Sequence, residues 1–270
     1  MPELPEMETY RKQCNEVIAG KIVTAVEVTR EKTVNVSVER FVRAVEGRRM
    51  VRIDRRAKML LFRLDSGDTL LLHLMLGGSM FFGSEEERLD RTAQVVLSFG
   101  DRHLYFHGLR LGYLHLYTEA ELAEVLRKFG PEPTDPAFRA DTFVELLKKR
   151  GRGVLKSTLT DQSVIAGIGN CYCDEMCFHA AIRPLRKIAD LTDTELHTLY
   201  TAMHSTLSEA IRYGGYMETK FNVGDTLTGG YNDRCRVYDR GDEPCFRCGE
   251  RIIQTKSNGR KVFYCGRCQR

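Results

Sequence analysis

Short runs in the first half of the chain alternate between apolar and polar positions, which is the pattern of strands with one buried face. The predicted strands cover residues 22–28, 50–54, 59–64, 69–76, 94–99 and 102–107. Asp65-Ser66-Gly67-Asp68 and Gly100-Asp101 are tight-turn sequences between neighbouring runs, and each predicts a β-hairpin. Many short strands joined by tight turns predict a β-sandwich or a β-barrel.

Helical spacing of apolar residues flanks this strand-rich region and dominates the second half of the chain. The predicted helices cover residues 6–18, 119–129, 141–149, 161–165, 172–181 and 193–213. Gly130-Pro131-Glu132-Pro133 ends the second of these helices and marks a domain junction, because its prolines cannot continue a helix. Gly214-Gly215 ends the last helix, and the glycine-rich polar residues 216–234 are expected to form a mobile loop.

Four of the nine cysteines form two Cys-X-X-Cys pairs near the C-terminus, Cys245/Cys248 and Cys265/Cys268, separated by sixteen residues. An odd cysteine count without a secretion signal argues against a disulfide scaffold. Two pairs at this separation predict a structural zinc site with four thiolate ligands and one Zn²⁺ per chain. A redox pair is the alternative, but it would not explain two copies. The intervening residues read as strand, turn and strand, which predicts a zinc-ribbon hairpin.

The remaining cysteines and the element pattern complete the predicted organisation. Cys171, Cys173 and Cys177 do not have the spacing of a zinc knuckle, so we interpret them as core residues. The chain is predicted to be an α+β protein with three parts. These are a strand-rich domain at 1–133, a helical domain at 134–234 and the zinc hairpin at 235–270.

Positive charge is concentrated at the C-terminus although the whole chain carries only +4. Residues 245–270 hold seven basic residues and one acid, a net of +6, so the other residues sum to −2. A basic tail ordered by zinc on a nearly neutral body points to a partner with dense negative charge, such as nucleic acid. The longest apolar stretch is interrupted by His73 and Gly77, and no targeting segment is evident. We therefore expect no membrane span and a cytoplasmic location.

Two short stretches have both an ordinary and a functional interpretation. Pro2-Glu3-Leu4-Pro5-Glu6 resembles an ordinary helix start, with early prolines and carboxylates. Gly167-Ile168-Gly169-Asn170 lies between two predicted helices. Glycines and amides at a helix start suit a phosphate group, but a plain interhelical turn explains this stretch equally well.

The motifs taken together, in their order, resemble the formamidopyrimidine-DNA glycosylase/endonuclease VIII family of base-excision repair enzymes. The motifs are Pro2-Glu3-Leu4-Pro5-Glu6, Arg55-Arg56-Ala57-Lys58, Gly130-Pro131-Glu132-Pro133, Asp161-Gln162 with Gly167-Ile168-Gly169-Asn170, and the four-cysteine hairpin. The resemblance covers essentially the whole chain. It implies an N-terminal β-sandwich, a C-terminal domain with a helix–two-turn–helix motif and a zinc finger, and DNA in the cleft between them.

The resemblance also implies a catalytic set. The α-amine of Pro2, freed by removal of Met1, would be the nucleophile, because an α-amine with a pKa near 8 is partly neutral at working pH. Glu3 would be the proton donor or shuttle, and Glu6 would have a supporting role or would simply begin a helix. Lys58 matches a pocket lysine that contacts phosphate beside the lesion.

DNA contacts follow from the same resemblance, with departures. His73, Asn170 and Arg260 match phosphate contacts. Leu76 stands where the family has a methionine that fills the gap left by the flipped nucleotide. Arg110 is retained opposite the orphaned base, whereas Leu111 replaces a wedging phenylalanine. These departures leave the lesion and opposite-base preferences open between the purine and pyrimidine branches.

We therefore expect a bifunctional DNA glycosylase and AP lyase. It would excise oxidised or ring-opened bases from duplex DNA through a Schiff base on Pro2, followed by β-elimination and δ-elimination. It is expected to act as a monomer in the bacterial cytoplasm or nucleoid, without an organic cofactor. The alternative is a non-catalytic paralogue that senses damage or abasic sites, against which the retained Pro2 and Glu3 argue. A zinc-ribbon transcription factor would not account for the N-terminal two-thirds.

Overall fold

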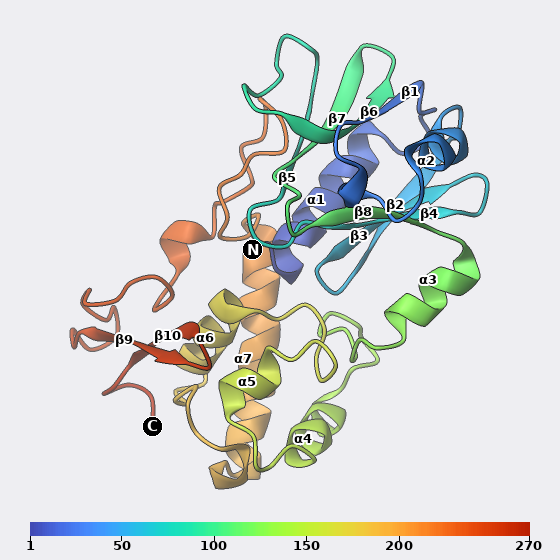
Figure 1. The fold of residues 1–270 in the computed structure, drawn as a ribbon. Coiled ribbons are helices and arrows are strands. Elements are labelled where there is room, and N and C mark those ends of the chain that lie inside the picture. The colour runs from blue at the N-terminus through green and yellow to red at the C-terminus, as the bar shows by residue number, and fades with distance from the viewer. The chain divides into compact units, whose positions relative to one another are not determined.

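Eight strands of the N-terminal half form two antiparallel four-stranded sheets in the computed structural model, which describes residues 1–270 (Figure 1). In order across the first sheet lie β1 (Ala25–Val28), β6 (Ala93–Phe99), β7 (Arg102–His107) and β5 (Ser79–Gly83). In order across the second lie β2 (Met50–Arg56), β3 (Met59–Leu64), β4 (Thr69–His73) and β8 (Tyr113–Tyr117). The predicted β-sandwich is confirmed.

The core of this sandwich comes from the inward-facing positions of both sheets. Phe62 of β3 and Phe106 of β7 meet edge to face, with ring centroids 6.2 Å apart, and both side chains are fully buried. The helix α1 (Leu4–Val17) adds Met7, Tyr10 and Cys14 to the same core. The predicted helix was therefore correct in place, but it begins at Leu4 rather than at residue 6.

Smaller elements complete this half. They are the short helix η1 (Glu31–Thr33), α2 (Val38–Val45) and α3 (Glu119–Leu126). The Thr118 side chain and Glu121 form a capping box that starts α3.

No helix in the chain combines the length and the apolar composition needed to span a bilayer.

The chain divides into two compact units, and neither unit is one continuous stretch of sequence. The first unit is Met1–Lys128 with Met217–Gly230, and the second is Phe129–Tyr216 with Tyr231–Arg270. The zinc hairpin thus groups with the helical segment, whereas part of the expected loop 216–234 groups with the sandwich. Within the first unit, Phe221 is fully buried and stacks on Phe82 at a centroid distance of 6.0 Å.

The second unit is built from helices and the C-terminal hairpin. Its helices are α4 (Ala140–Lys148), α5 (Leu155–Leu159), α6 (Asn170–His179), η2 (Ile188–Asp190), α7 (Asp193–Arg212) and η3 (Asn232–Arg234). Cys171, Cys173 and Cys177 are fully buried in its core, as predicted.

One predicted helix is wrong. Residues 161–165 form turns, and the helix lies just before them at α5. The Asp161 carboxylate accepts hydrogen bonds from the N–H and the hydroxyl of Ser163, at 2.9 and 2.7 Å. This side chain therefore folds the backbone into a local turn in place of a helix.

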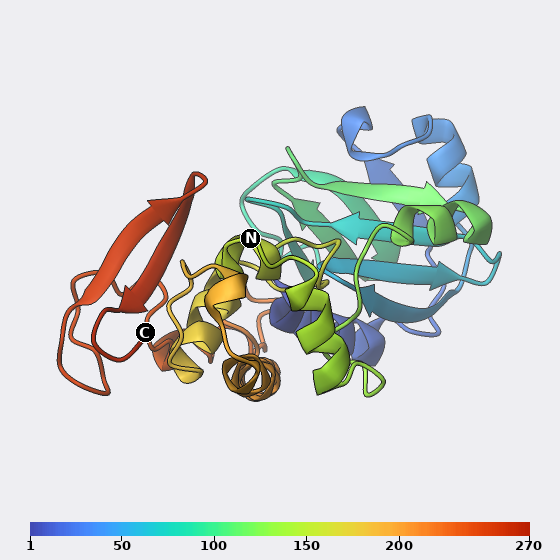
Figure 2. The ribbon, with the colours of Figure 1, turned by 90° about the horizontal axis from the view of Figure 1, so that it is seen from below.

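The hairpin consists of β9 (Ile252–Ser257) and β10 (Arg260–Cys265), joined by Asn258 and Gly259. Figure 2 shows its two strands side by side. Both turn residues have positive φ, 48° and 75°, which is the geometry of the preferred Asn-Gly hairpin turn.

Candidate active site and nucleic-acid interface

Pro2, Glu3 and Glu6 lie at the start of α1 and are buried, whereas Met1 is 38% exposed. Pro2 is buried, and the Glu3 and Glu6 side chains are only 3% and 1% exposed. Glu3 is the N-cap, and its backbone N–H donates to Oε2 of Glu6 at 2.7 Å. Both carboxylates thus belong to the first turn of α1, where the helix dipole favours negative charge.

Lys58 lies in the two-residue turn between β2 and β3. It is 5% exposed, and its neighbour Ala57 has a φ of 52°, so the backbone turns sharply there. Arg55 braces this turn by donating to the Ala57 carbonyl at 3.0 Å and to the Glu8 carboxylate at 3.2 Å. The Arg55–Glu8 contact connects the lysine turn to α1.

His73, the last residue of β4, is held in a neutral form. Burial, reinforced by the positive charges of Lys58 and Lys128, lowers the pKa of His73 to about 4. Its Nδ1 accepts the backbone N–H of Met75 at 3.0 Å, which leaves the ring proton on Nε2. Because the charge of Lys58 lowers the pKa of His73, these two predicted phosphate contacts lie near each other.

Leu76, Arg110 and Leu111 lie together on the surface. They line a hollow of about 650 Å³. Leu76 is 67% exposed and Leu111 is 63% exposed, which is unusual for large apolar side chains. The loops that carry them touch, because a Cβ on Gly108 would lie 2.2 Å from the Gly77 carbonyl oxygen.

The residue just before Arg110 and Leu111 lies inside the protein and not on its surface. Leu109 is fully buried in the sandwich core, with its N–H bonded to Gln94 and its carbonyl accepting from Arg30. It anchors the loop whose next two residues, Arg110 and Leu111, stay on the surface.

The turn before α6 is organised by one side chain, Gln162. Its amide nitrogen donates to the carbonyls of Thr160 and Ile168, and its amide oxygen accepts the Gly167 N–H at 2.8 Å. Asn170 is the first residue of α6, and its Oδ1 is buried without a hydrogen-bond partner. This oxygen is an acceptor, so a phosphate group could be bound only by the N–H groups of the same amide.

Arg260 begins β10 and reaches the same turn. Its guanidinium donates to the Thr160 hydroxyl at 2.8 Å. Both residues line a hollow of about 440 Å³, whose wall also contains Asp161, Gln162 and Asn258. Asn170 does not line this hollow. The structure therefore places Arg260 beside residues 160–162 of the turn and does not place it with Asn170.

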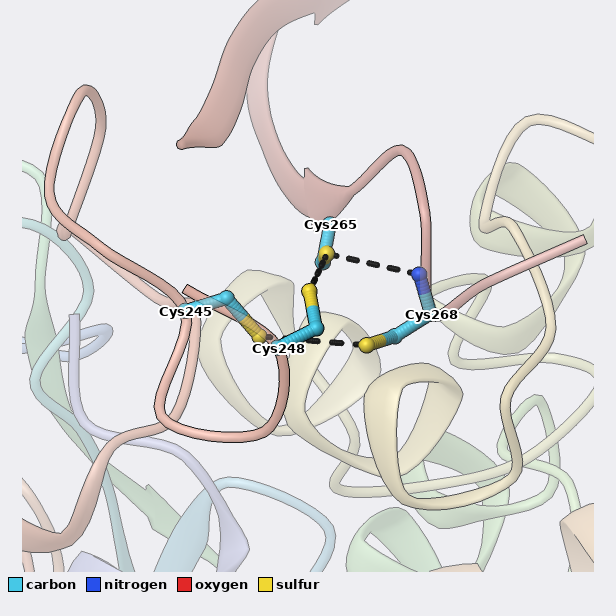
Figure 3. A group of neighbouring side chains, drawn as sticks. All are labelled: Cys245, Cys248, Cys265 and Cys268. Atoms are coloured by element: carbon cyan, nitrogen blue, oxygen red, sulfur yellow. Dashed lines mark hydrogen bonds between the residues drawn. The ribbon is translucent and has the colours of Figure 1, made fainter. Parts of the chain in front are cut away.

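The four C-terminal cysteines form one cluster with the geometry of a zinc site (Figure 3). All four sulfurs lie within 4.8 Å of one another, with Cys245–Cys268 at 4.0 Å and Cys248–Cys265 at 3.5 Å. A tetrahedron with Zn–S bonds of about 2.3 Å separates its sulfurs by about 3.8 Å. The donor set therefore fits one structural Zn²⁺.

Sequence reasoning missed two buried acids in the middle of α6. Both Asp174 oxygens accept from Nζ of Lys156 at 2.7 Å, and Lys156 also donates to the carbonyl of Lys261 in β10. The carboxylate of Glu175 accepts three consecutive backbone N–H groups, those of Arg236, Val237 and Tyr238. Adjacent acids in an otherwise apolar helix were the available signal, since buried charges need partners.

Family models match three parts of the chain. They describe a formamidopyrimidine-DNA glycosylase N-terminal domain at residues 1–113, a formamidopyrimidine-DNA glycosylase H2TH domain at 129–222, and a zinc finger found in FPG and IleRS at 242–270.

The chain is similar over its whole length to known relatives and to solved structures. Formamidopyrimidine-DNA glycosylases of Lactobacillus delbrueckii and Geobacillus kaustophilus are 34% and 37% identical, with 100% of both chains covered. The Lactococcus lactis Fpg in complex with an abasic site containing DNA is 30% identical and matches with a TM-score of 0.91 over 99% of both chains. The same enzyme with an N7-benzyl-Fapy-dG containing DNA is 28% identical, with a TM-score of 0.91 over 99% of both chains.

Proposed function

Because the chain belongs to the formamidopyrimidine-DNA glycosylase family, we propose that it excises oxidised or ring-opened bases from duplex DNA and cleaves the strand at the resulting abasic site. The single observation that supports this most directly is the buried start of α1, where Pro2 precedes Glu3 and the backbone N–H of Glu3 donates to the carboxylate of Glu6. DNA binding alone would not require an amine and two acids at one buried point.

The reaction begins with the Pro2 amine, which is free once Met1 has been removed. Its lone pair attacks C1′ of the sugar, the bond from C1′ to the base breaks, and the base departs with a proton. Glu3 supplies and recovers protons at the sugar and the base. The C1′–O4′ bond of the sugar then breaks, O4′ takes a proton, and the nitrogen lone pair forms the iminium with C1′. This iminium acidifies the C2′ hydrogen, and loss of that proton expels the 3′-phosphate by β-elimination. A second elimination on the 5′ side releases the sugar.

DNA-binding roles are assigned to the remaining residues of the proposed site. Lys58 and His73 bind phosphate near the lesion, His73 through its Nε2–H. Leu76 and Leu111 fill the space vacated by the flipped nucleotide, and Arg110 faces the orphaned base. Asn170, through its side-chain N–H groups, and Arg260, through its guanidinium, hold backbone phosphates on the second unit. The protein acts as a monomer on damaged DNA in the bacterial cytoplasm or nucleoid.

Borohydride trapping tests the reaction. The protein is incubated with duplexes that each carry one defined lesion or an abasic site, and borohydride then reduces any Schiff base to a stable adduct. We expect a covalent protein–DNA adduct, with intact mass showing loss of Met1 in the reacting material. The absence of an adduct on every duplex would favour a non-catalytic damage sensor.

The variant Pro2→Gly locates the nucleophile. It should lose most of the adduct, whereas full trapping would place the reacting amine elsewhere in the chain. Glu3→Gln serves as the companion variant, because it keeps the amine and removes the proton shuttle. It should lose base excision while it still binds an abasic duplex.

A further inference from the structure

A second basic hollow lies on the second unit, beside the one that contains Arg260. It has a volume of about 730 Å³ and is lined mainly by residues 148–153, between α4 and α5, together with part of α5 and the following turn. Ser157 and Asp161 line both hollows, so the two are continuous along the surface.

Positive charge dominates this hollow. Lys148, Lys149, Arg150 and Arg152 line it, and Asp161 is the only carboxylate that does so. Asp193 neutralises Lys148 through an ion pair of 2.7 Å. The other three cations are exposed, and no acidic side chain lies within ion-pairing distance of them. Against the single carboxylate, the hollow retains a net charge of about +2.

The segment that carries these cations is fixed in place. Its backbone bonds to residues 186–189 through Leu155 N–H to Arg186, Ile188 N–H to Gly153 and Ala189 N–H to Gly151, at 2.9 to 3.0 Å. A Cβ on Gly153 would lie 2.6 Å from the Thr158 hydroxyl, so the segment packs directly against α5. The backbone positions of these cations are therefore set before an anion binds.

We propose that the hollow formed by residues 148–153 is a second binding site for the sugar-phosphate backbone of DNA. It continues the phosphate tract that begins at Arg260. The chemistry favours a phosphodiester chain because three cations without a carboxylate partner line a hollow that is open to solvent rather than enclosed around a small molecule. The inference rests on the proposed DNA-binding function and adds a contact area to it.

Salt-dependent binding of the full-length protein tests this site. The probe is a 30-base-pair duplex with a central stable abasic analogue, and its association constant is measured over a range of KCl concentrations. In the variant Lys149→Ala/Arg150→Ala/Arg152→Ala, the slope of log K against log [KCl] should fall in magnitude by about 2 to 3, since each phosphate contact contributes about 0.9. Affinity near 0.15 M KCl should drop on the order of 30- to 100-fold.

A matched control removes the same charge from the first unit. Lys32→Ala/Arg40→Ala/Arg43→Ala takes away three exposed cations and should leave the slope within about 0.5 of wild type. Single-turnover cleavage at saturating enzyme should be unchanged in both variants, because neither touches the catalytic residues. An unchanged slope in the 149/150/152 variant, or an equal loss in the control, would overturn the proposal.

The two proposals fail in different ways. If wild-type protein forms no Schiff-base adduct but the 149/150/152 variant loses salt-dependent binding, the catalytic assignment fails and the phosphate site stands. If wild-type protein forms the adduct but the 149/150/152 variant keeps the wild-type salt slope, the catalytic assignment stands and the phosphate site fails.

Discussion

The backbone N–H of Glu3 donates to the carboxylate of Glu6 at 2.7 Å, and both side chains are almost completely buried. Glu6 therefore does more than begin a helix by its charge, because it fixes the backbone of the residue next to the proposed nucleophile. This geometry supports a positioning role for Glu6. Together with the proton-transfer role proposed for Glu3, it predicts different behaviour for variants of the two residues.

Substitution of Glu6 should act on stability and alignment. Glu6→Gln keeps a hydrogen-bond acceptor and should retain most trapping, whereas Glu6→Ala should lower the free energy of unfolding by about 1 kcal/mol. Glu3→Gln should slow base excision by about 10²-fold or more with little change in stability. Single-turnover excision and thermal unfolding distinguish these outcomes. A greater catalytic loss in Glu6→Gln than in Glu3→Gln would reverse the assigned roles.

Leu76 and Leu111 should matter for duplex DNA only. Both side chains are mostly exposed, so Leu76→Ala or Leu111→Ala should leave the unfolding free energy nearly unchanged. Each should reduce excision from duplex DNA by roughly tenfold, because an apolar wedge worth about 1–2 kcal/mol is lost. Cleavage of a single-stranded abasic substrate is the internal comparison and should keep its rate. The buried neighbour provides the control, since Leu109→Ala should destabilise the fold by about 2–5 kcal/mol.

His73 should remain neutral well below pH 6.5. Burial lowers its pKa to about 4, so the unfolded chain binds the proton first as the pH falls from 6.5 to 4. The unfolding free energy contributed by this residue is therefore complete above pH 6.5 and is lost towards pH 4, by up to about 3 kcal/mol. Imidazole NMR shifts measured in the free protein should show no titration above pH 5. The variant His73→Gln should show a flatter stability profile across this interval.

The buried Lys156–Asp174 pair should tie the hairpin to the helices. Asp174→Asn leaves the Lys156 ammonium buried without its counter-ion and should cost about 3–5 kcal/mol. Lys156→Met/Asp174→Leu should recover much of this loss, because it removes both charges. Chemical denaturation measures each value. Glu124→Gln breaks the exposed Arg127–Glu124 pair and should change stability by less than about 1 kcal/mol.

Zinc removal should unfold the hairpin while the sandwich persists. Native protein should contain one zinc per chain by elemental analysis, and Cys248→Ser should lower that content together with affinity for duplex DNA. Cys171→Ser is the comparison, because that cysteine lies in the helical core away from the cluster. A zinc content that is unchanged in Cys248→Ser would contradict the four-cysteine site.

The parts of the fold that the sequence predicts best are those whose signals are local. The turns 65–68 and 100–101 and the Cys-X-X-Cys spacing each depend on a few neighbouring residues, and all three appear as expected. β5 was missed because all five of its residues are buried, so it has no alternation. β8 does alternate, but its outer positions are Tyr and His, which obscured the apolar and polar contrast.

The parts that the sequence could not predict depend on distant partners. α5 has only five residues and includes Lys156, whose burial makes sense only with Asp174 opposite. The predicted strand 69–76 ends early at His73, because Met75 and Gly77 have positive φ values where two loops meet. The hollow around Leu76, Arg110 and Leu111 likewise joins residues that are more than thirty positions apart.

Residues 217–230 belong to the first unit although they follow most of the second unit in the sequence, and this order affects folding during synthesis on the ribosome. Phe221 belongs to the sandwich core, and its carbonyl accepts the backbone N–H of Phe82 at 2.7 Å. The N-terminal unit therefore cannot complete its core when residue 128 emerges, and must wait for about another hundred residues. At about 5–20 residues per second this delay is roughly 5–20 s. During that interval the nascent sandwich lacks the Phe221 ring against Tyr10 and Phe82, so part of its core stays open to solvent until synthesis is nearly complete.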